Sequence, residues 1–136
     1  MSGNSLLIDT NIALYLLNGD TTIAELLDGR DIHVSFITEL ELLGFQDLKE
    51  DDRSIIEELL SNCIIVDLNQ AIKRITIDLK QKYKLKLPDA IIAATSIYMN
   101  LPLISADKDF ERILTVFVCV RPRPIKIYET FTQRYH

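Results

Sequence analysis

A short apolar run that ends in a carboxylate constrains the fold of this chain more than any other feature. Residues 6–8 (Leu-Leu-Ile) lead directly into Asp9, and Thr10 and Asn11 follow. A short apolar run bounded by polar residues is typical of a buried strand in a parallel sheet. In open α/β sheets, ligands bind at the carboxyl ends of such strands. The sequence therefore predicts that Asp9 lies where an active site would be built.

Segments with strand patterns alternate with segments that have helix patterns. We expect strands at residues 6–8, 32–36, 63–66, 103–105, 116–120 and 125–128. We expect helices at residues 10–17, 22–27, 38–45, 51–62, 68–83, 87–99 and 108–114. This alternation is typical of the α/β class with a mainly parallel sheet. The 136 residues carry no internal repeat or linker, so we expect one domain over residues 1–136.

Composition and charge exclude several classes of protein. A hydrophobic content of 48% argues against a disordered chain, and no apolar run reaches the roughly 20 residues of a membrane span. The N-terminus has no signal-peptide pattern, and both cysteines (Cys63 and Cys119) lie in apolar sequence, as expected for buried thiols in a reducing cytoplasm. The net charge of −5 argues against a broad basic surface that binds nucleic acid. It does not exclude a nuclease that uses cations to bind phosphate at one place.

Several acidic residues occupy junctions between strands and helices. Asp9 and Asp107 each follow an apolar strand, and Asp109 comes two residues after Asp107. Asp89 heads an otherwise uncharged helix, and Glu41 lies in the first turns of another. Because the carboxyl ends of parallel strands meet at one edge of a sheet, we expect these acids to lie close together.

Each acid also suits a purely structural role. Asp9 can cap the helix that follows it, and Glu41 completes a Thr-x-x-Glu capping box with the threonine three residues earlier. Asp89 is favourable at a helix N-terminus through the helix dipole, by about 0.3–1 kcal/mol. Asp107 and Asp109 are common turn residues.

The acids are stronger evidence for a functional site as a group than singly. Carboxylates gathered at one sheet edge repel one another, and their pKa values rise unless a cation offsets the charge. Mg²⁺ prefers oxygen ligands and is typically held by one or two carboxylates together with substrate phosphate. Such an ion activates water and stabilises the charge that develops on a phosphate. The acids therefore predict a divalent metal site suited to phosphodiester hydrolysis.

Three motifs in order carry a resemblance to a known family. They are LLIDTNIALYLL at residues 6–17, VSFITELELLGF at 34–45 and LPDAIIAATSIYMNLPLISADKDFERI at 87–113. With them the chain resembles PIN-domain nucleases, in particular the VapC-like toxins of bacterial toxin–antitoxin pairs. The resemblance spans nearly the whole chain. It implies a PIN-like three-layer α/β/α sandwich with a central, mainly parallel sheet of four to five strands.

The resemblance also implies roles for individual residues. The acidic quartet that binds Mg²⁺ or Mn²⁺ in that family corresponds to Asp9, Glu41, Asp89 and Asp107. Small polar residues that support the pocket correspond to Thr10, Asn11 and Ser105. Asp9 and Asp89 would be the main ligands, and Asp109 competes with Asp107 for the fourth place. Glu41 would bind a second ion or orient the attacking water.

The activity and the partners follow from the same resemblance. It implies endonucleolytic cleavage of RNA, with tRNA and rRNA as substrates in the family. It also implies a homodimer and a separate antitoxin protein that covers the acidic pocket, with no membrane partner. The alternative is a catalytically silent PIN-like module that binds RNA or protein without cutting.

Four lysines alternate along the segment before Asp89. They are Lys80, Lys82, Lys84 and Lys86. One hypothesis is that some of them contact phosphates of the substrate. The alternative is a solvated helix end whose cations are favourable to the helix dipole.

Overall fold

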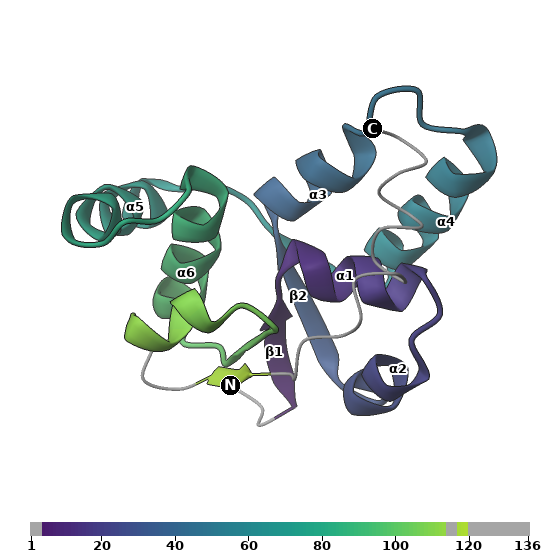
Figure 1. The fold of residues 1–136 in the computed structure, drawn as a ribbon, viewed down its shortest axis with the longest axis horizontal. Helices are drawn as coiled ribbons and strands as arrows, with labels where there is room; N and C mark the ends of the chain where they lie inside the picture. Colours follow the sequence, from purple (N-terminus) through teal and green to yellow (C-terminus); the bar gives the residue numbers. More distant parts are fainter. Residues whose placement is uncertain (1–3, 114–116, 120–136) are drawn as a thin grey trace.

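A five-stranded, all-parallel sheet forms the centre of the molecule (Figure 1). The structure is a computed structural model that describes residues 4–113 and 117–119. The strands are β1 (Ser5–Ile8), β2 (Asp31–Ser35), β3 (Ile64–Val66), β4 (Leu103–Ser105) and β5 (Phe117–Cys119). The strand expected at 125–128 falls beyond these residues.

The order of the strands creates a break in the winding of the sheet. The order is β3-β2-β1-β4-β5, so the chain runs outward from β1 to β3 and then returns to the other side of β1 with β4. The connections that follow β1 and β4 therefore diverge. In open α/β sheets the crevice at such a point is the usual place for a ligand.

Helices cover both faces of the sheet, so the expected three-layer sandwich is confirmed (Figure 1). The helices are α1 (Thr10–Leu17), α2 (Thr21–Leu27), α3 (Phe36–Leu43), α4 (Glu50–Ser61), α5 (Gln70–Lys82), α6 (Leu87–Met99) and the short 3-10 helix η1 (Lys108–Arg112). In Figure 1, α5 and α6 lie on one side of β1 and β2, and α1, α2 and α4 lie on the other. None of the helices in the described ranges is both long and apolar enough to span a membrane.

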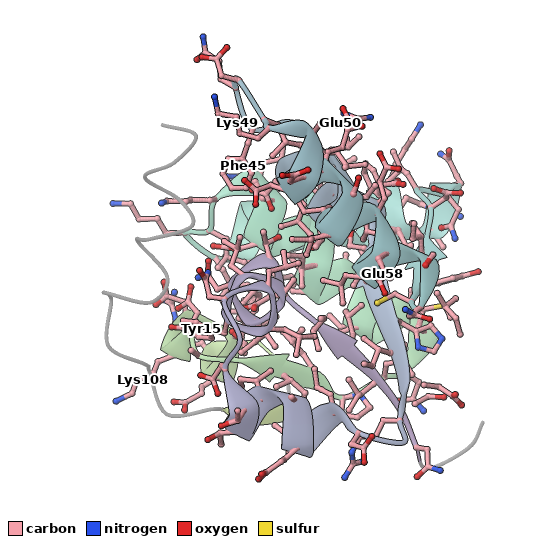
Figure 2. All side chains as sticks on the ribbon, turned by 90° about the vertical axis from the view of Figure 1, so that its right-hand side faces the viewer. Tyr15, Phe45, Lys49, Glu50, Glu58 and Lys108 are labelled. Atoms are coloured by element: carbon pink, nitrogen blue, oxygen red, sulfur yellow. The ribbon has the colours of Figure 1, made fainter. Side chains whose placement is uncertain are left out.

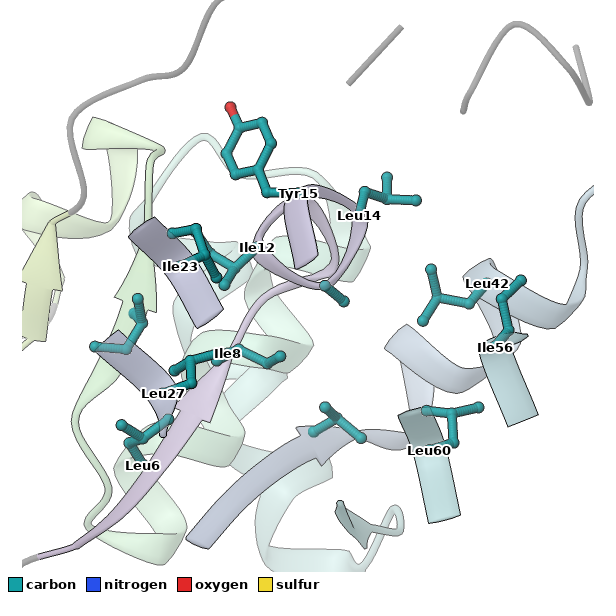
Figure 3. Close-up of a cluster of buried hydrophobic side chains, with 13 residues drawn as sticks. Leu6, Ile8, Ile12, Leu14, Tyr15, Ile23, Leu27, Leu42, Ile56 and Leu60 are labelled. Atoms are coloured by element: carbon teal, nitrogen blue, oxygen red, sulfur yellow. The ribbon is translucent and has the colours of Figure 1, made fainter. Parts of the chain in front are cut away.

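Two hydrophobic clusters occupy the two faces of the sheet. Successive side chains of a strand point to opposite faces, so Leu6 and Ile8 belong to the cluster beneath α1, α2 and α4, which Figure 3 shows. Leu7 belongs to the cluster beneath α5 and α6. In β4, Ile104 joins the first cluster and Leu103 the second. The strands that end at the acids are thus packed on both faces.

The helix expected at residues 38–45 begins two residues earlier than the sequence indicated. The Oγ atom of Ser35 accepts a hydrogen bond from the N–H of Ile37 at 3.2 Å, so Ser35 caps α3. Thr38 lies inside the helix and cannot cap it. The interpretation of Glu41 as part of a capping box is therefore wrong.

Gly44 ends α3 where a side chain would not fit. A Cβ atom at this position would lie 2.5 Å from the carbonyl oxygen of Leu40.

Cys63 is a partly buried free thiol that packs against the hydrophobic cluster beneath α1, α2 and α4. Burial raises the pKa of Cys63 to about 11, so the thiol is protonated and a poor nucleophile at neutral pH.

Two neighbouring isoleucines on α4 test the position of the core. Ile56 is 0% exposed, whereas Ile55 is 48% exposed. We expect Ile56→Ala to lower the free energy of unfolding by about 2–5 kcal/mol because it leaves a cavity. The matched control Ile55→Ala should change it by less than about 0.5 kcal/mol. Urea denaturation measures both, and equal effects would contradict the described packing of α4.

Candidate active site

A hydrogen bond between side chains joins the carboxyl ends of the paired strands β1 and β4. Asp9 follows β1 directly and is only 4% exposed, and Ser105 ends β4 and is fully buried. The Ser105 hydroxyl donates to Oδ2 of Asp9 at 2.5 Å. The N–H of Asp107 in turn donates to the Ser105 Oγ at 2.9 Å. Ser105 therefore fixes the position of the Asp9 carboxylate and of the chain that carries Asp107.

Asp9 caps α1 as well. Its Oδ1 accepts a hydrogen bond from the N–H of Ile12 at 2.9 Å, as the capping interpretation predicts. Capping alone does not need a charge, because Asn69 caps α5 through the same bond to the N–H of Ile72 at 2.8 Å. The cap bond by itself therefore does not require a carboxylate at position 9.

Burial raises the pKa of Asp9 to about 6. The hydrogen bonds from Ser105 and Ile12 lower the pKa, and the charges of Asp89 and Asp107 raise it further. Desolvation and like charges both oppose ionisation of this carboxyl. Asp9 is thus a buried acid whose charge is opposed by two neighbouring acids.

Asp89 approaches Asp9 from a different element, helix α6. It lies in the first turn of α6 and is partly buried. Burial raises the pKa of Asp89, as do the charges of Asp107, Glu41 and Asp109, while Lys86 lowers it. The four acids expected to form the site are therefore close enough for their charges to interact.

A chain of hydroxyl groups links Glu41 to α1. The Thr10 hydroxyl donates to Oε1 of Glu41 at 2.7 Å, and the Oγ1 atoms of Thr10 and Thr38 are 3.0 Å apart. Because Thr10 has one hydroxyl proton and gives it to a carboxylate, the Thr38 hydroxyl donates to Thr10. Thr38 is a member of the site that sequence reasoning missed, since its only local signal was the capping pattern. Asn11 is exposed and makes no side-chain hydrogen bond among the residues described.

Asp107 and Asp109, the two candidates for the fourth acid, differ in their surroundings. Asp107 is partly buried, accepts a hydrogen bond from the N–H of Asp109 at 2.9 Å, and acts on both Asp9 and Asp89. Asp109 is exposed and lies 3.8 Å from the guanidinium of Arg112. Asp107 is therefore the acid nearer the buried centre.

A pocket of about 500 Å³ opens beside these acids. Its lining combines both signs of charge and consists of Lys84, Leu85, Lys86, Asp89, Asp107 and Asp109. Lys108, between two of the acids in sequence, is exposed and its side chain points outward (Figure 2). The cations of the pocket thus come from the loop between α5 and α6.

The donor set suits a hard divalent cation. Over residues 4–113 and 117–119, no three acidic, histidine or cysteine side chains form a ready-made metal cage. Mg²⁺ commonly takes only one or two carboxylates and keeps several waters, so it does not need one. The Asp9 carboxylate is buried beside two acids, and among the residues that the structure describes its charge is stabilised by the hydrogen bonds from Ser105 and Ile12. Oxygen donors with unbalanced negative charge fit Mg²⁺ or Mn²⁺.

Comparison with known proteins identifies the family. The sequence profile of the PIN domain matches residues 6–114. The chain belongs to the PIN domain family. Proteins of this family are nucleases. No protein in the curated collection matches the chain significantly.

Solved structures agree with this assignment of the PIN domain. A chain of a toxin–antitoxin complex from Klebsiella pneumoniae is 34% identical, with a TM-score of 0.74 over 83% of this chain and 96% of that one. A chain of VapBC-1 from nontypeable Haemophilus influenzae is 26% identical, with a TM-score of 0.67 over 84% and 96%. A chain of VapBC2 from Rickettsia felis, 24% identical with a TM-score of 0.68 over 84% and 96%, shares the fold.

The buried charge of Asp9 should lower the stability of the metal-free PIN domain. We expect Asp9→Asn to raise the free energy of unfolding in EDTA at about pH 7.5 by roughly 1–3 kcal/mol, since an amide keeps the cap without the charge. The folded-state pKa of Asp9 lies above its ordinary value of 3.8. The loss of stability caused by its buried charge is therefore fully present above about pH 6 and declines towards pH 4. The gain from the amide should shrink in the same window.

Asp20 supplies the matched control for this measurement. It caps α2 with the same bond, from the N–H of Ile23 to Oδ1 at 3.0 Å, but it is not buried. Asp20→Asn should therefore not raise the free energy of unfolding measured with denaturant. An equal gain from both substitutions would show that the effect belongs to capping and not to the buried charge.

Proposed function

We propose that this PIN domain is a divalent-metal-dependent endoribonuclease and the toxin of a toxin–antitoxin pair. The observation that carries the proposal is the carboxylate of Asp9, buried at the break in the sheet winding with Asp89 and Asp107 beside it. Keeping a buried charge among like charges costs stability, and a bound divalent cation would offset that cost. Membership of a nuclease family supports the same conclusion.

The ion would be Mg²⁺ or Mn²⁺. Asp9 and Asp89 would be its main ligands, and the partial burial of Asp107 favours it over Asp109 for completing the site. A divalent ion held there would lower the pKa of water and offset the charge that develops on a phosphate. Glu41 would assist from the rim of the site by orienting the attacking water or by holding a second ion.

The hydroxyl groups of the site would position its acids. Ser105 holds Oδ2 of Asp9 and the N–H of Ile12 holds Oδ1, so the carboxylate has a fixed orientation. Thr10, itself held by Thr38, holds Oε1 of Glu41 and leaves Oε2 for a water molecule. These bonds would fix the acids before substrate arrives and reduce the reorganisation that cleavage requires.

The proposed partners follow from the relatives. The 34% identical chain belongs to a toxin–antitoxin complex, which supports an antitoxin as the inhibitor of this protein, reaching the acidic pocket with a basic side chain. The substrate would be a cytoplasmic RNA, with tRNA and rRNA as the first candidates. A homodimer would also be expected, and its interface could use the apolar surface of Leu40 on α3 and Leu87 on α6, which are 57% and 55% exposed on helices in contact.

Cleavage of total RNA tests the proposed activity. We expect discrete cleavage in Mg²⁺ or Mn²⁺ that stops with EDTA and falls to background in Asp9→Asn, since the variant loses a main ligand. Asp20→Asn should cleave like the wild type, because its cap lies on α2. The products can be resolved by gel electrophoresis and primer extension.

A silent module would give a different pattern. If no cleavage is seen, the melting temperature in millimolar Mn²⁺ shows whether the protein binds the metal, because a ligand that binds only the folded state raises the melting temperature. A rise that Asp9→Asn abolishes would retain the metal site and leave the RNA substrate to be found. An unmoved melting temperature together with no cleavage would overturn the proposal in favour of a non-catalytic binding module.

Ser105 should act on the metal through Asp9. We expect Ser105→Ala to weaken Mn²⁺ binding by about 10–100-fold, the usual effect of removing a group that orients a metal ligand. Isothermal titration with Mn²⁺ measures this directly. Unchanged affinity in a folded variant would show that the hydrogen bond serves only the stability of the fold.

A further inference from the structure

The structure divides the four alternating lysines into two pairs. The Lys82 Nζ atom pairs with the carboxylate of Asp78, one turn earlier on α5, at 3.1 Å. The Lys80 Nζ atom donates to the carbonyl oxygen of Leu85 at 2.5 Å. These two cations are therefore engaged with α5 and with the loop that follows it.

The other pair lines the acidic pocket. Lys84 and Lys86 share its wall with Asp89, Asp107 and Asp109. Both lysines are exposed, and within the described part of the chain neither side chain makes a hydrogen bond or an ion pair. Their ammonium groups are available to a ligand that enters the pocket.

The burial and the hydrogen bonds of Leu85 fix the loop that carries these two lysines. Leu85 is buried in the cluster beneath α5 and α6, and its N–H donates to the carbonyl oxygen of Tyr83 at 3.1 Å. Its own carbonyl oxygen accepts from Lys80. Leu85 is 6% exposed, whereas Lys84 and Lys86 on either side of it are exposed and line the pocket.

Charge explains why a nuclease would need cations at this place. The chain carries a net charge of −5, and the pocket wall alone contributes three carboxylates. A divalent ion would offset charge at the phosphate that is cut but not at its neighbours along the strand. A lysine ammonium is a compact charge that suits a single phosphate group.

We propose that Lys84 and Lys86 bind the phosphates that flank the cleaved bond, so that the loop between α5 and α6 sets the path of the RNA into the pocket. This inference rests on the proposed function, since it assigns the substrate contacts of the same site. Lys80 holds the loop through Leu85, Lys82 pairs with Asp78 within α5, and neither lysine contacts the RNA. The two lysines of the pocket are thus substrate-binding residues.

The salt dependence of RNA binding tests this assignment apart from cleavage. The full chain with Asp9→Asn binds a short fluorescein-labelled single-stranded RNA in Mg²⁺, and anisotropy gives Kd between about 50 and 200 mM KCl. Adding Lys84→Gln and Lys86→Gln should reduce the slope of log K against log salt by about 1.4, or about 0.7 for each phosphate contact. Adding Lys82→Gln, the matched control, should leave the slope unchanged.

Kinetics of the active protein provide a second measurement. In the wild-type background, the Lys84→Gln/Lys86→Gln variant should raise KM for RNA by about tenfold at about 150 mM salt and leave kcat within a few-fold. Lys82→Gln should change neither constant. A fall in kcat with an unchanged KM would contradict a role in holding flanking phosphates.

The outcomes separate this inference from the proposed function. Intact RNA cleavage with an unchanged salt slope would overturn the lysine assignment alone. RNA binding that depends on the lysines in a protein that never cleaves would support the assignment and count against the nuclease. If Lys86→Gln alters Mn²⁺ affinity but not the slope, Lys86 is only a counter-ion for Asp89, and the assignment is wrong.

Discussion

The hydrogen bond from Ser105 to Asp9 is the interaction on which the arrangement of the site depends. It joins the ends of β1 and β4, two neighbouring strands whose residues are 96 positions apart in sequence. The bond lies where the winding of the sheet changes direction and the following segments diverge. Because the N–H of Asp107 binds the same Ser105 oxygen, one hydroxyl orders acids from two parts of the chain.

The fold tolerates a buried charge at Asp9 because the strands around it are packed on both faces. Leu7 and Ile8 of β1 are fully buried and belong to different clusters, and Leu103 of β4 lies in the same cluster as Leu7. Apolar burial of this kind contributes about 25 cal/mol per Å² and offsets the desolvation of one carboxylate. The acid can therefore be held rigidly where hydration would otherwise favour its exposure.

The sequence was most informative where the determinants of structure are local. The bounds of α1 and α6 follow from the strand end at Asp9 and from the proline in the first turn of α6, and the observed helices have the predicted limits. The start of α3 was misplaced because Ser35 and Thr38 are both good caps, and only tertiary packing selects between them. The bond between Thr10 and Glu41 spans 31 residues, so no local pattern contains it. The strand order, which brings β4 beside β1, was likewise not predicted from the sequence.

The loop before α6 shows why structural and functional explanations of one residue need not compete. Asp89 gains from the positive end of the helix dipole, as its position predicts, and it also faces the other acids. Lys86 precedes the helix and acts on Asp89 without pairing with it. The alternating lysines look equivalent in sequence, but Lys80 and Lys82 bind groups of the chain itself while Lys84 and Lys86 line the pocket. A short loop thus places an acid for a metal ion and cations for a polyanion within one turn of each other.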